Sequence, residues 1–167
     1  MRRLQPSRKI VLAIASSFQN KKLSEVGSVV DLIRRSSSVG KLVVHLGFKA
    51  KYCHKIFVHK EIQQRCKEIF YEVADAHGIL ITEIGFDKDH AHIVADIGLK
   101  SIPEVAKLLK GTSAKFLLRE FPLLKQQYFW GSGLWSPIVY FDSVGRNLED
   151  ISSYVRNQGL PRNTPSL

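Results

Sequence analysis

The alternation of apolar and polar residues along the chain predicts a regular succession of strands and helices. Residues 41–52 (KLVVHLGFKAKY) have the character of a strand. Residues 61–78 follow a helical period, with Gly78 as the expected C-terminal stop and an apolar face formed by Ile62, Cys66, Ile69, Phe70 and Val73. Two apolar, β-branched runs, 79–86 and 92–99, are joined by the polar segment DKDHA and predict a hairpin.

The second half of the pattern predicts two further helices around one more strand. Residues 101–104 (SIPE) form a capping box with a proline at the start of the helix, which runs to about Phe121. Residues 137–144 (PIVYFDSV) have the composition of a strand. Asn147 is the expected cap of the last helix, whose buried face would hold Leu148, Ile151 and Val155.

The resulting order is strand, helix, strand, strand, helix, strand, helix. This order predicts an α+β fold, a ferredoxin-like split βαβ antiparallel sheet with helices on one face. An additional C-terminal helix carries Tyr154. In such a sheet the second face is expected to be free for a partner.

The N-terminal residues have a different pattern and predict an appendage to this domain. Helical spacing relates Val26, Val29, Val30 and Ile33. A basic, serine-rich stretch follows at 34–40 and is typical of a linker. We therefore expect an N-terminal extension and linker over 1–40, a main domain over 41–160 and a C-terminal tail over 161–167. No apolar run approaches the ~20 residues of a membrane span, so no membrane partner is expected.

The charge of the chain adds a partner to this picture. The 167 residues include 25 Lys and Arg against 15 Asp and Glu, which gives a net charge of +10 and a pI near 9.8. Such an excess favours a polyanion, most often nucleic acid and less often anionic lipid. Only two cysteines, Cys53 and Cys66, are present, too few for a disulfide framework, and reduced thiols are typical of a cytoplasmic protein.

Two pairs of residues carry candidate chemistry. His90 and His92 are separated by one residue, so on a strand both imidazoles project to the same side and could bind one metal ion. Tyr154 and Gln158 lie four apart on the last helix and share a face, where a phenol could act as nucleophile and an amide oxygen as ligand. Histidines satisfied at a strand edge and an ordinary exposed helix surface are the alternatives, and these residues alone leave them open.

Four segments occur together in one order and spacing. They are DKDHAH (87–92), LLKGTSAKFLLREFP (108–122), WGSGLWSP (130–137) and YVRNQG (154–159). In this arrangement the chain resembles, over roughly 41–160, the small single-tyrosine transposases of bacterial and archaeal insertion sequences. These IS200-like enzymes have a His-hydrophobic-His (HUH) motif and move their elements as single-stranded DNA.

The resemblance implies a site and a mechanism. His90, His92 and Gln158 match the metal ligands of the family, and Tyr154 matches its nucleophile. The enzyme would hold Mg²⁺ or Mn²⁺, form a 5′-phosphotyrosine intermediate, and cut and rejoin single-stranded DNA at hairpin-containing element ends. Family members are homodimers, and the tyrosine helix of one subunit commonly completes the histidine site of the other.

Basic residues give the candidate DNA contacts. They recur along the second predicted helix and around the first strand, at Lys107, Lys110, Lys115, Arg119, Lys49 and Lys51, although a solvated helix face is as compatible with each lysine taken singly. Trp130 and Trp135 could stack on unpaired bases or plug the core. Two other functions use similar residues: an HUH replication initiator or relaxase nuclease, and a non-catalytic ferredoxin-like nucleic-acid-binding module.

Overall fold

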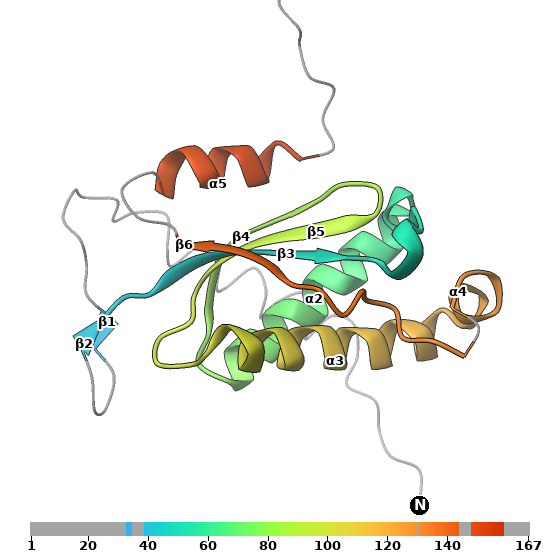
Figure 1. The fold of residues 1–167 in the computed structure, drawn as a ribbon, viewed down its shortest axis with the longest axis horizontal. Helices are drawn as coiled ribbons and strands as arrows, with labels where there is room; N and C mark the ends of the chain where they lie inside the picture. Colours follow the sequence, from blue (N-terminus) through green and yellow to red (C-terminus); the bar gives the residue numbers. More distant parts are fainter. Residues whose placement is uncertain (1–32, 35–38, 130, 144–147, 159–167) are drawn as a thin grey trace, which may run out of the picture. The chain divides into compact units, whose positions relative to one another are not determined.

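A computed structural model describes residues 33–34, 39–129, 131–143 and 148–158 (Figure 1). The chain divides into units 1–32 and 33–167, and the described residues all belong to the second. Its four-stranded sheet consists of β3 (Val43–Lys49), β4 (Leu80–Phe86), β5 (His90–Asp96) and β6 (Tyr140–Ser143). The longer helices are α2 (Lys60–Ala76), α3 (Ile102–Glu120) and α5 (Leu148–Arg156). Shorter helical segments are η1 (Lys51–Cys53), η2 (Ile56–Val58) and α4 (Pro122–Gln127).

The sheet has the predicted ferredoxin-like topology. Its strand order is β4-β5-β3-β6, and each neighbouring pair is antiparallel. The β4–β5 hairpin is confirmed, but its turn contains only residues 87–89, so that His90 already belongs to β5. The ladder between β4 and β5 shifts its register between Ile81 and Glu83, and this irregularity sets which residues of the two strands face each other.

The helix boundaries follow from the signals in the sequence. The hydroxyl of Ser101 accepts a hydrogen bond from the backbone N–H of Glu104 at 3.4 Å, which caps the first turn of α3. Helix α2 ends at Ala76, and Gly78 has a φ of +64°, the left-handed conformation that favours glycine after a helix. The predicted start of α3 at Ser101 and the predicted end of α2 before Gly78 are therefore both confirmed.

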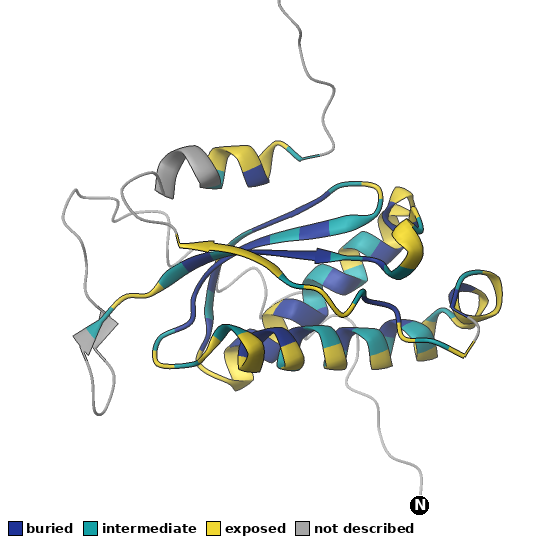
Figure 2. Ribbon diagram, viewed as in Figure 1, coloured by how far each residue is buried: buried dark blue, intermediate teal, exposed yellow. Residues whose placement is uncertain are grey.

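Helices α2 and α3 cover one face of the sheet, and the main core lies between them and the strands (Figures 1 and 2). Alternate residues of the two central strands enter this core, among them Leu46, Phe48, Ala91 and Ile93. Trp135 is buried against the rings of Phe48, Phe57 and Phe70. Its indole N–H donates to the hydroxyl of Ser113 at 2.9 Å, so Trp135 belongs to the core, whereas Trp130 lies outside the described residues.

Helix α5 lies against the opposite face, which the sequence predicted to be free. Val155 is buried there beside Val94 of β5, and the Arg156 guanidinium donates to the Glu83 carboxylate of β4 at 2.6 Å. The prediction of a free face was thus wrong for β4 and β5, because the last helix folds back over these two strands. Leu148 and Ile151, predicted on the same buried face, have side chains outside the described residues.

At the two ends of the predicted linker over 34–40, the chain forms a pair of short strands. Strand β1 (Ile33–Arg34) pairs antiparallel with β2 (Val39–Gly40). Ile33 is therefore in a strand rather than on a helical face, while 1–32 and the expected cap Asn147 lie outside the described residues. Within the described part of the chain, no helix is both long and apolar enough to cross a membrane.

Candidate active site

The strand register places the functional side chains in rows on the α5 face of the sheet. On β3, His45, Gly47 and Lys49 alternate with core residues and point to this face. Lys49 pairs with His90, and Gly47 pairs with His92. The two histidines of β5 therefore project to the same side, as the i, i+2 spacing predicted.

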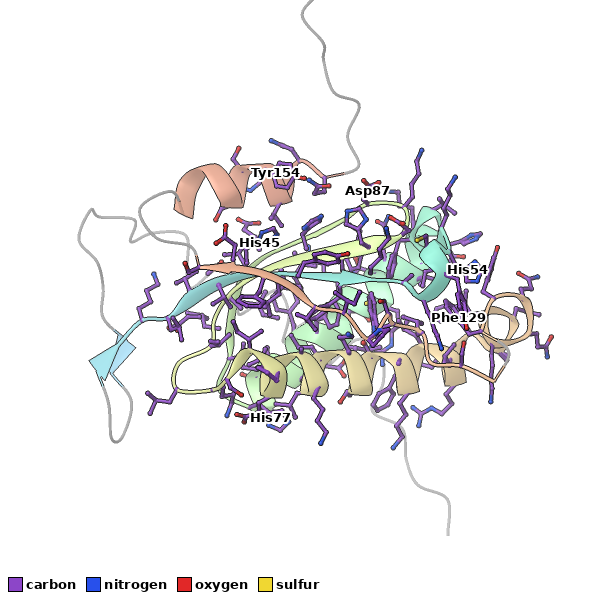
Figure 3. The ribbon with its side chains drawn as sticks, in the orientation of Figure 1. His45, His54, His77, Asp87, Phe129 and Tyr154 are labelled. Atoms are coloured by element: carbon purple, nitrogen blue, oxygen red, sulfur yellow. The ribbon has the colours of Figure 1, made fainter. Side chains whose placement is uncertain are left out.

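These rows form the wall of an open pocket of about 400 Å³. Strands β3, β5 and β6 contribute its lining, which includes His45, Lys49, His90, His92, Tyr140 and Asp142. Figure 3 shows His45 and Tyr154 on the same side of the sheet, whereas His77 lies on the side of α2 and α3. The pocket thus has cationic, anionic and imidazole groups on a face that the main core does not use.

Asp89 sets the orientation of His90. Its carboxylate Oδ1 lies 2.6 Å from His90 Nδ1, so the ring donates this N–H and keeps Nε2 free. Asp89 also forms an ion pair with Lys49 at 3.7 Å. The pKa of Lys49 is raised, first by its interaction with the Cys53 side chain and then by the charge of Asp89, so this side chain remains a cation beside the pocket.

His92 has the features of a metal ligand. Its Nδ1 lies 2.9 Å from Nε2 of His45, and its own Nε2 is buried without a hydrogen-bond partner. Burial, followed by the neighbouring His90 and His45, lowers the pKa of His92 to about 4, so the ring is neutral at neutral pH. Burial also lowers the pKa of His45, against the opposing charge of Asp142. A neutral imidazole with an unpartnered nitrogen fits a divalent cation.

A cation beside these two histidines would need a further ligand of another kind. Among the residues that the structure describes, no three His, Cys, Asp or Glu side chains are grouped so as to hold a metal ion. An amide oxygen such as that of Gln158 is a suitable third ligand for Mg²⁺ or Mn²⁺. The residues present therefore fit a divalent cation bound by two imidazoles and an oxygen.

Tyr154 extends from α5 toward the histidines of its own chain. Its ring centroid lies 5.9 Å from that of His92, and the two rings meet edge to face at 78°. Half of the residue is exposed, at 50% of its possible surface. The phenol therefore has one side against an imidazole and another side exposed.

Gly85 allows α5 to approach the sheet closely enough for this contact. It pairs with His92 across the β4–β5 ladder. A Cβ at Gly85 would lie 2.0 Å from the carbonyl oxygen of Val155 and 3.2 Å from Cβ of Gln158.

Gln158 follows the end of α5, in a turn, and its N–H donates to Val155 O at 3.3 Å. The prediction that Gln158 lies on the helix was thus wrong, yet the turn brings it to the strand beside His92.

We expect Gly85→Ala to displace α5 from the sheet. A methyl group 2.0 Å from a backbone oxygen cannot be accommodated by side-chain rotation, so the helix must move. Amide hydrogen exchange in 148–156 should become faster, while exchange in β3 and β5 should stay slow. Gly111→Ala in α3 is the matched control, because a Cβ there meets nothing within 4 Å and alanine stabilises a helix by about 0.5–1 kcal/mol. Unchanged exchange of α5 in Gly85→Ala would contradict the proposed docking.

The predicted DNA contacts divide between the two faces. Lys49 lines the pocket, and Lys51 follows β3 in η1. Lys107, Lys115 and Arg119 are exposed on α3, which packs on the opposite face of the sheet.

Lys110 has a different environment from the other cations of α3. Its ammonium donates to the backbone carbonyls of Ser136, Pro137 and Ile138 at 2.6, 3.4 and 3.3 Å. It is half-buried, and this burial lowers its pKa. Lys110 therefore holds the segment before β6 in place, a role that helical spacing alone does not distinguish from a phosphate contact.

Comparison with known proteins identifies the family. The sequence profile described as "Transposase IS200 like" matches residues 38–158, which is most of the chain. The chain belongs to the IS200-like transposase family. Family membership supports transposition of an insertion sequence, and hence DNA processing, as the general activity of the protein.

Individual relatives agree with this family assignment. The chain is 30% identical over 122 residues to the ISDra2 transposase TnpA of Deinococcus radiodurans, covering 72% of this chain and 86% of that one. It is 29% identical over 119 residues to the transposase for insertion sequence element IS200 of Salmonella typhimurium, covering 68% and 74%. A crystal structure of a Deinococcus radiodurans protein assigned as a transposase superposes with a TM-score of 0.62 at 30% identity, covering 76% of this chain and 98% of that one.

Two residues of this candidate site in the IS200-like chain were not predicted from the sequence pattern. His45 contacts His92 directly, and Gly85 determines how closely α5 approaches. The two-residue period of a strand could have identified His45, because residues 45, 47 and 49 lie on the same face of the predicted strand. The residues around Gly85 in the sequence contain no signal for its role. That role is to leave space for α5, a helix about seventy residues further along the chain.

Proposed function

We propose that the protein cuts and rejoins single-stranded DNA at insertion-sequence ends through a 5′-phosphotyrosine on Tyr154. The observation that carries this proposal is the juxtaposition at His92. Its buried Nε2 has no hydrogen-bond partner, and its ring meets that of Tyr154 at 5.9 Å. His90, His92 and Gln158 would hold the divalent cation, which when bound supplies Lewis acidity at the scissile phosphate.

The reaction requires two transfers at one phosphorus. The phenol of Tyr154 gives up its proton to water as its oxygen attacks, a bond from tyrosine oxygen to phosphorus forms, and the bond from phosphorus to the 3′-oxygen breaks. The released 3′-oxygen takes up a proton, and the 5′-phosphate stays on Tyr154. A 3′-hydroxyl then attacks the phosphotyrosine, the bond from tyrosine oxygen to phosphorus breaks, and the phenol of Tyr154 is restored as the hydroxyl gives up its proton. The phosphodiester is thereby re-formed, so no nucleoside triphosphate is needed. Lys49, beside the pocket, contributes positive charge near the phosphate.

We propose that the strand to be cut crosses the open half of the α5 face. Lys49 and Lys51 lie along this path, at the end of β3. The exposed cations of α3 are on the far face, so we assign Lys107, Lys115 and Arg119 to other parts of the DNA, such as a hairpin stem, and leave Lys110 out of the DNA-binding set.

Lys49→Ala should weaken binding of a short single strand that contains the cleavage site. Loss of one phosphate contact lowers the slope of log Kd against log salt concentration by about 0.7 for single strands. Fluorescence anisotropy at several salt concentrations measures this slope. Lys107→Ala removes the same charge from the far face and should leave the slope for that short strand unchanged; equal effects of the two variants would argue against the proposed path.

We propose a homodimer that pairs through β6. This strand is at the edge of the sheet, and Ile138, Tyr140 and Phe141 beside or within it are exposed. Exposed edge strands favour pairing with another chain. Because Tyr154 meets His92 of its own chain, sharing of the site between subunits is not required. Light scattering tests the assembly, and a monomer mass at all concentrations would contradict it.

Covalent capture of DNA tests the proposed function. The wild-type protein, incubated with single-stranded element ends and Mn²⁺, should yield a species that survives boiling in denaturant, and chelation of the cation should prevent it. A non-catalytic nucleic-acid-binding module would bind the same DNA without forming this species. Membership of a transposase family also favours this activity over a replication initiator or relaxase.

A further inference from the structure

His45 is the one imidazole of the pocket lining that the proposed mechanism does not use. It lies on β3, diagonal to His92 across the ladder with β5. The two rings are stacked, with centroids 5.1 Å apart and planes inclined by 23°, and a hydrogen bond of 2.9 Å joins His45 Nε2 to His92 Nδ1. Between two neutral imidazoles, one nitrogen must donate and the other must accept.

The two possible proton positions have opposite consequences for His92. If His45 donates, His92 accepts at Nδ1 and carries its proton on Nε2. That N–H would be buried without an acceptor, and the ring could not bind a cation through it. If His92 donates from Nδ1, its Nε2 has a free lone pair instead. Only donation from His92 Nδ1 leaves the buried Nε2 able to bind a cation.

We propose that His45 is a positioning residue, whose Nε2 accepts a hydrogen bond from His92 Nδ1–H and thereby fixes the His92 tautomer with Nε2 free for the cation. This inference rests on the proposed role of His92 as a metal ligand. The partner of His90 supports it by analogy, since Asp89 accepts from His90 Nδ1 at 2.6 Å. Each histidine then has Nδ1 occupied by a neighbour of its own chain and Nε2 left for binding.

The charge of the pocket explains why an imidazole takes this position. A carboxylate is the commoner partner of a metal-bound histidine. Here Asp89 already lies beside His90, and Asp142 lies opposite His45 in the ladder with β6. A third carboxylate beside His92 would repel an incoming phosphate, whereas a neutral imidazole accepts the hydrogen bond without adding negative charge. Since its Nε2 is engaged by His92, His45 is not itself a ligand through that atom.

The tautomer can be measured directly in the wild-type protein without metal. Long-range ¹H–¹⁵N spectra of ¹⁵N-histidine-labelled protein distinguish a protonated Nδ1 from a protonated Nε2, and the His92 signals are assigned by their absence in His92→Asn. At pH 7 we expect His92 to be protonated on Nδ1. A proton on Nε2 overturns the inference, irrespective of whether the protein binds metal or forms a DNA adduct.

Two variants of His45 then test its effect on the cation. His45→Phe keeps a flat ring for stacking but removes the acceptor, and should weaken Mn²⁺ binding by about 10–100-fold in a titration followed by electron paramagnetic resonance. His45→Gln keeps an acceptor and should retain affinity within a few-fold. Equal affinities of wild type and His45→Phe overturn the inference. An absence of Mn²⁺ binding by the wild type would instead refute the proposed function, and the tautomer would still report on the His45–His92 pair.

Discussion

Replacing Tyr154 with phenylalanine should abolish the covalent adduct with DNA while leaving DNA binding intact. The substitution removes only the hydroxyl, so the edge-to-face contact with His92 and the position of α5 are kept. Removal of an enzymic nucleophile lowers the rate on the order of 10⁴-fold or more, which places the adduct below detection. Denaturing electrophoresis of end-labelled DNA measures the adduct, and fluorescence anisotropy measures the binding.

Tyr140→Phe provides the matched control. Tyr140 lines the histidine pocket from β6 and is exposed, so it is a second phenol that a bound phosphate could reach. We expect this variant to form the adduct at close to the wild-type rate. Retention of the adduct by Tyr154→Phe together with its loss in Tyr140→Phe would transfer the nucleophile from α5 to β6 and refute the proposed roles.

Replacing His92 with alanine should prevent metal binding and, with it, strand cleavage. The substitution removes the buried Nε2 and leaves His90 as the only imidazole ligand of the proposed set. We expect Mn²⁺ affinity to fall at least about 100-fold, beyond the effect of a residue that only orients a ligand. Adduct formation should slow by about 10²–10³-fold, the usual consequence of removing a group that stabilises the transition state. Calorimetric titration and a single-turnover cleavage assay measure the two quantities.

His77→Ala is the control for the loss of a histidine as such. His77 is exposed at the end of α2, on the far side of the sheet (Figure 3). Its variant should bind Mn²⁺ and cleave DNA as the wild type does. Thermal unfolding of both variants excludes loss of the fold as the cause. Undiminished cleavage by a folded His92→Ala protein would contradict a metal held at this position.

The sheet and its two covering helices could be predicted because local signals determined them. The hydroxyl of Ser101 caps the start of α3, and Gly78 adopts a left-handed conformation just after the end of α2. Both signals act within a few residues of the helix end. The hairpin that carries His90 and His92 has the alternating pattern of two strands around a polar turn. The period-2 geometry of a strand was then sufficient to place both imidazoles on one face.

The errors concern contacts between distant segments. Helix α5 was predicted as a helix, but its position over β4 and β5 depends on the absence of a side chain at Gly85, which looks like any other strand residue in sequence. Likewise, Ile33 was predicted on a helical face, but it belongs to a strand because Ile33–Arg34 pairs with Val39–Gly40. A single sequence contains no direct signal for either contact.

The apolar core and the candidate active site lie on opposite faces of the sheet. The α2 and α3 face contains the large apolar core, and the α5 face contains the polar rows around His92. On that face, small residues stand on both sides of the histidine, with Gly47 toward the pocket and Gly85 toward α5. The His92 ring can therefore line the pocket and contact Tyr154 of α5 at the same time.

The most direct test of the proposed chemistry is to identify the residue that carries the DNA. After reaction with single-stranded element ends and Mn²⁺, nuclease and trypsin digestion separates peptide 147–156, which contains Tyr154, from peptide 126–146, which contains Tyr128 and Tyr140. Mass spectrometry should find a nucleotide joined through its 5′-phosphate to Tyr154 alone, and only in samples that received the cation. A nucleotide on any other residue, or a Tyr154 adduct that forms equally well in chelator, would contradict the account.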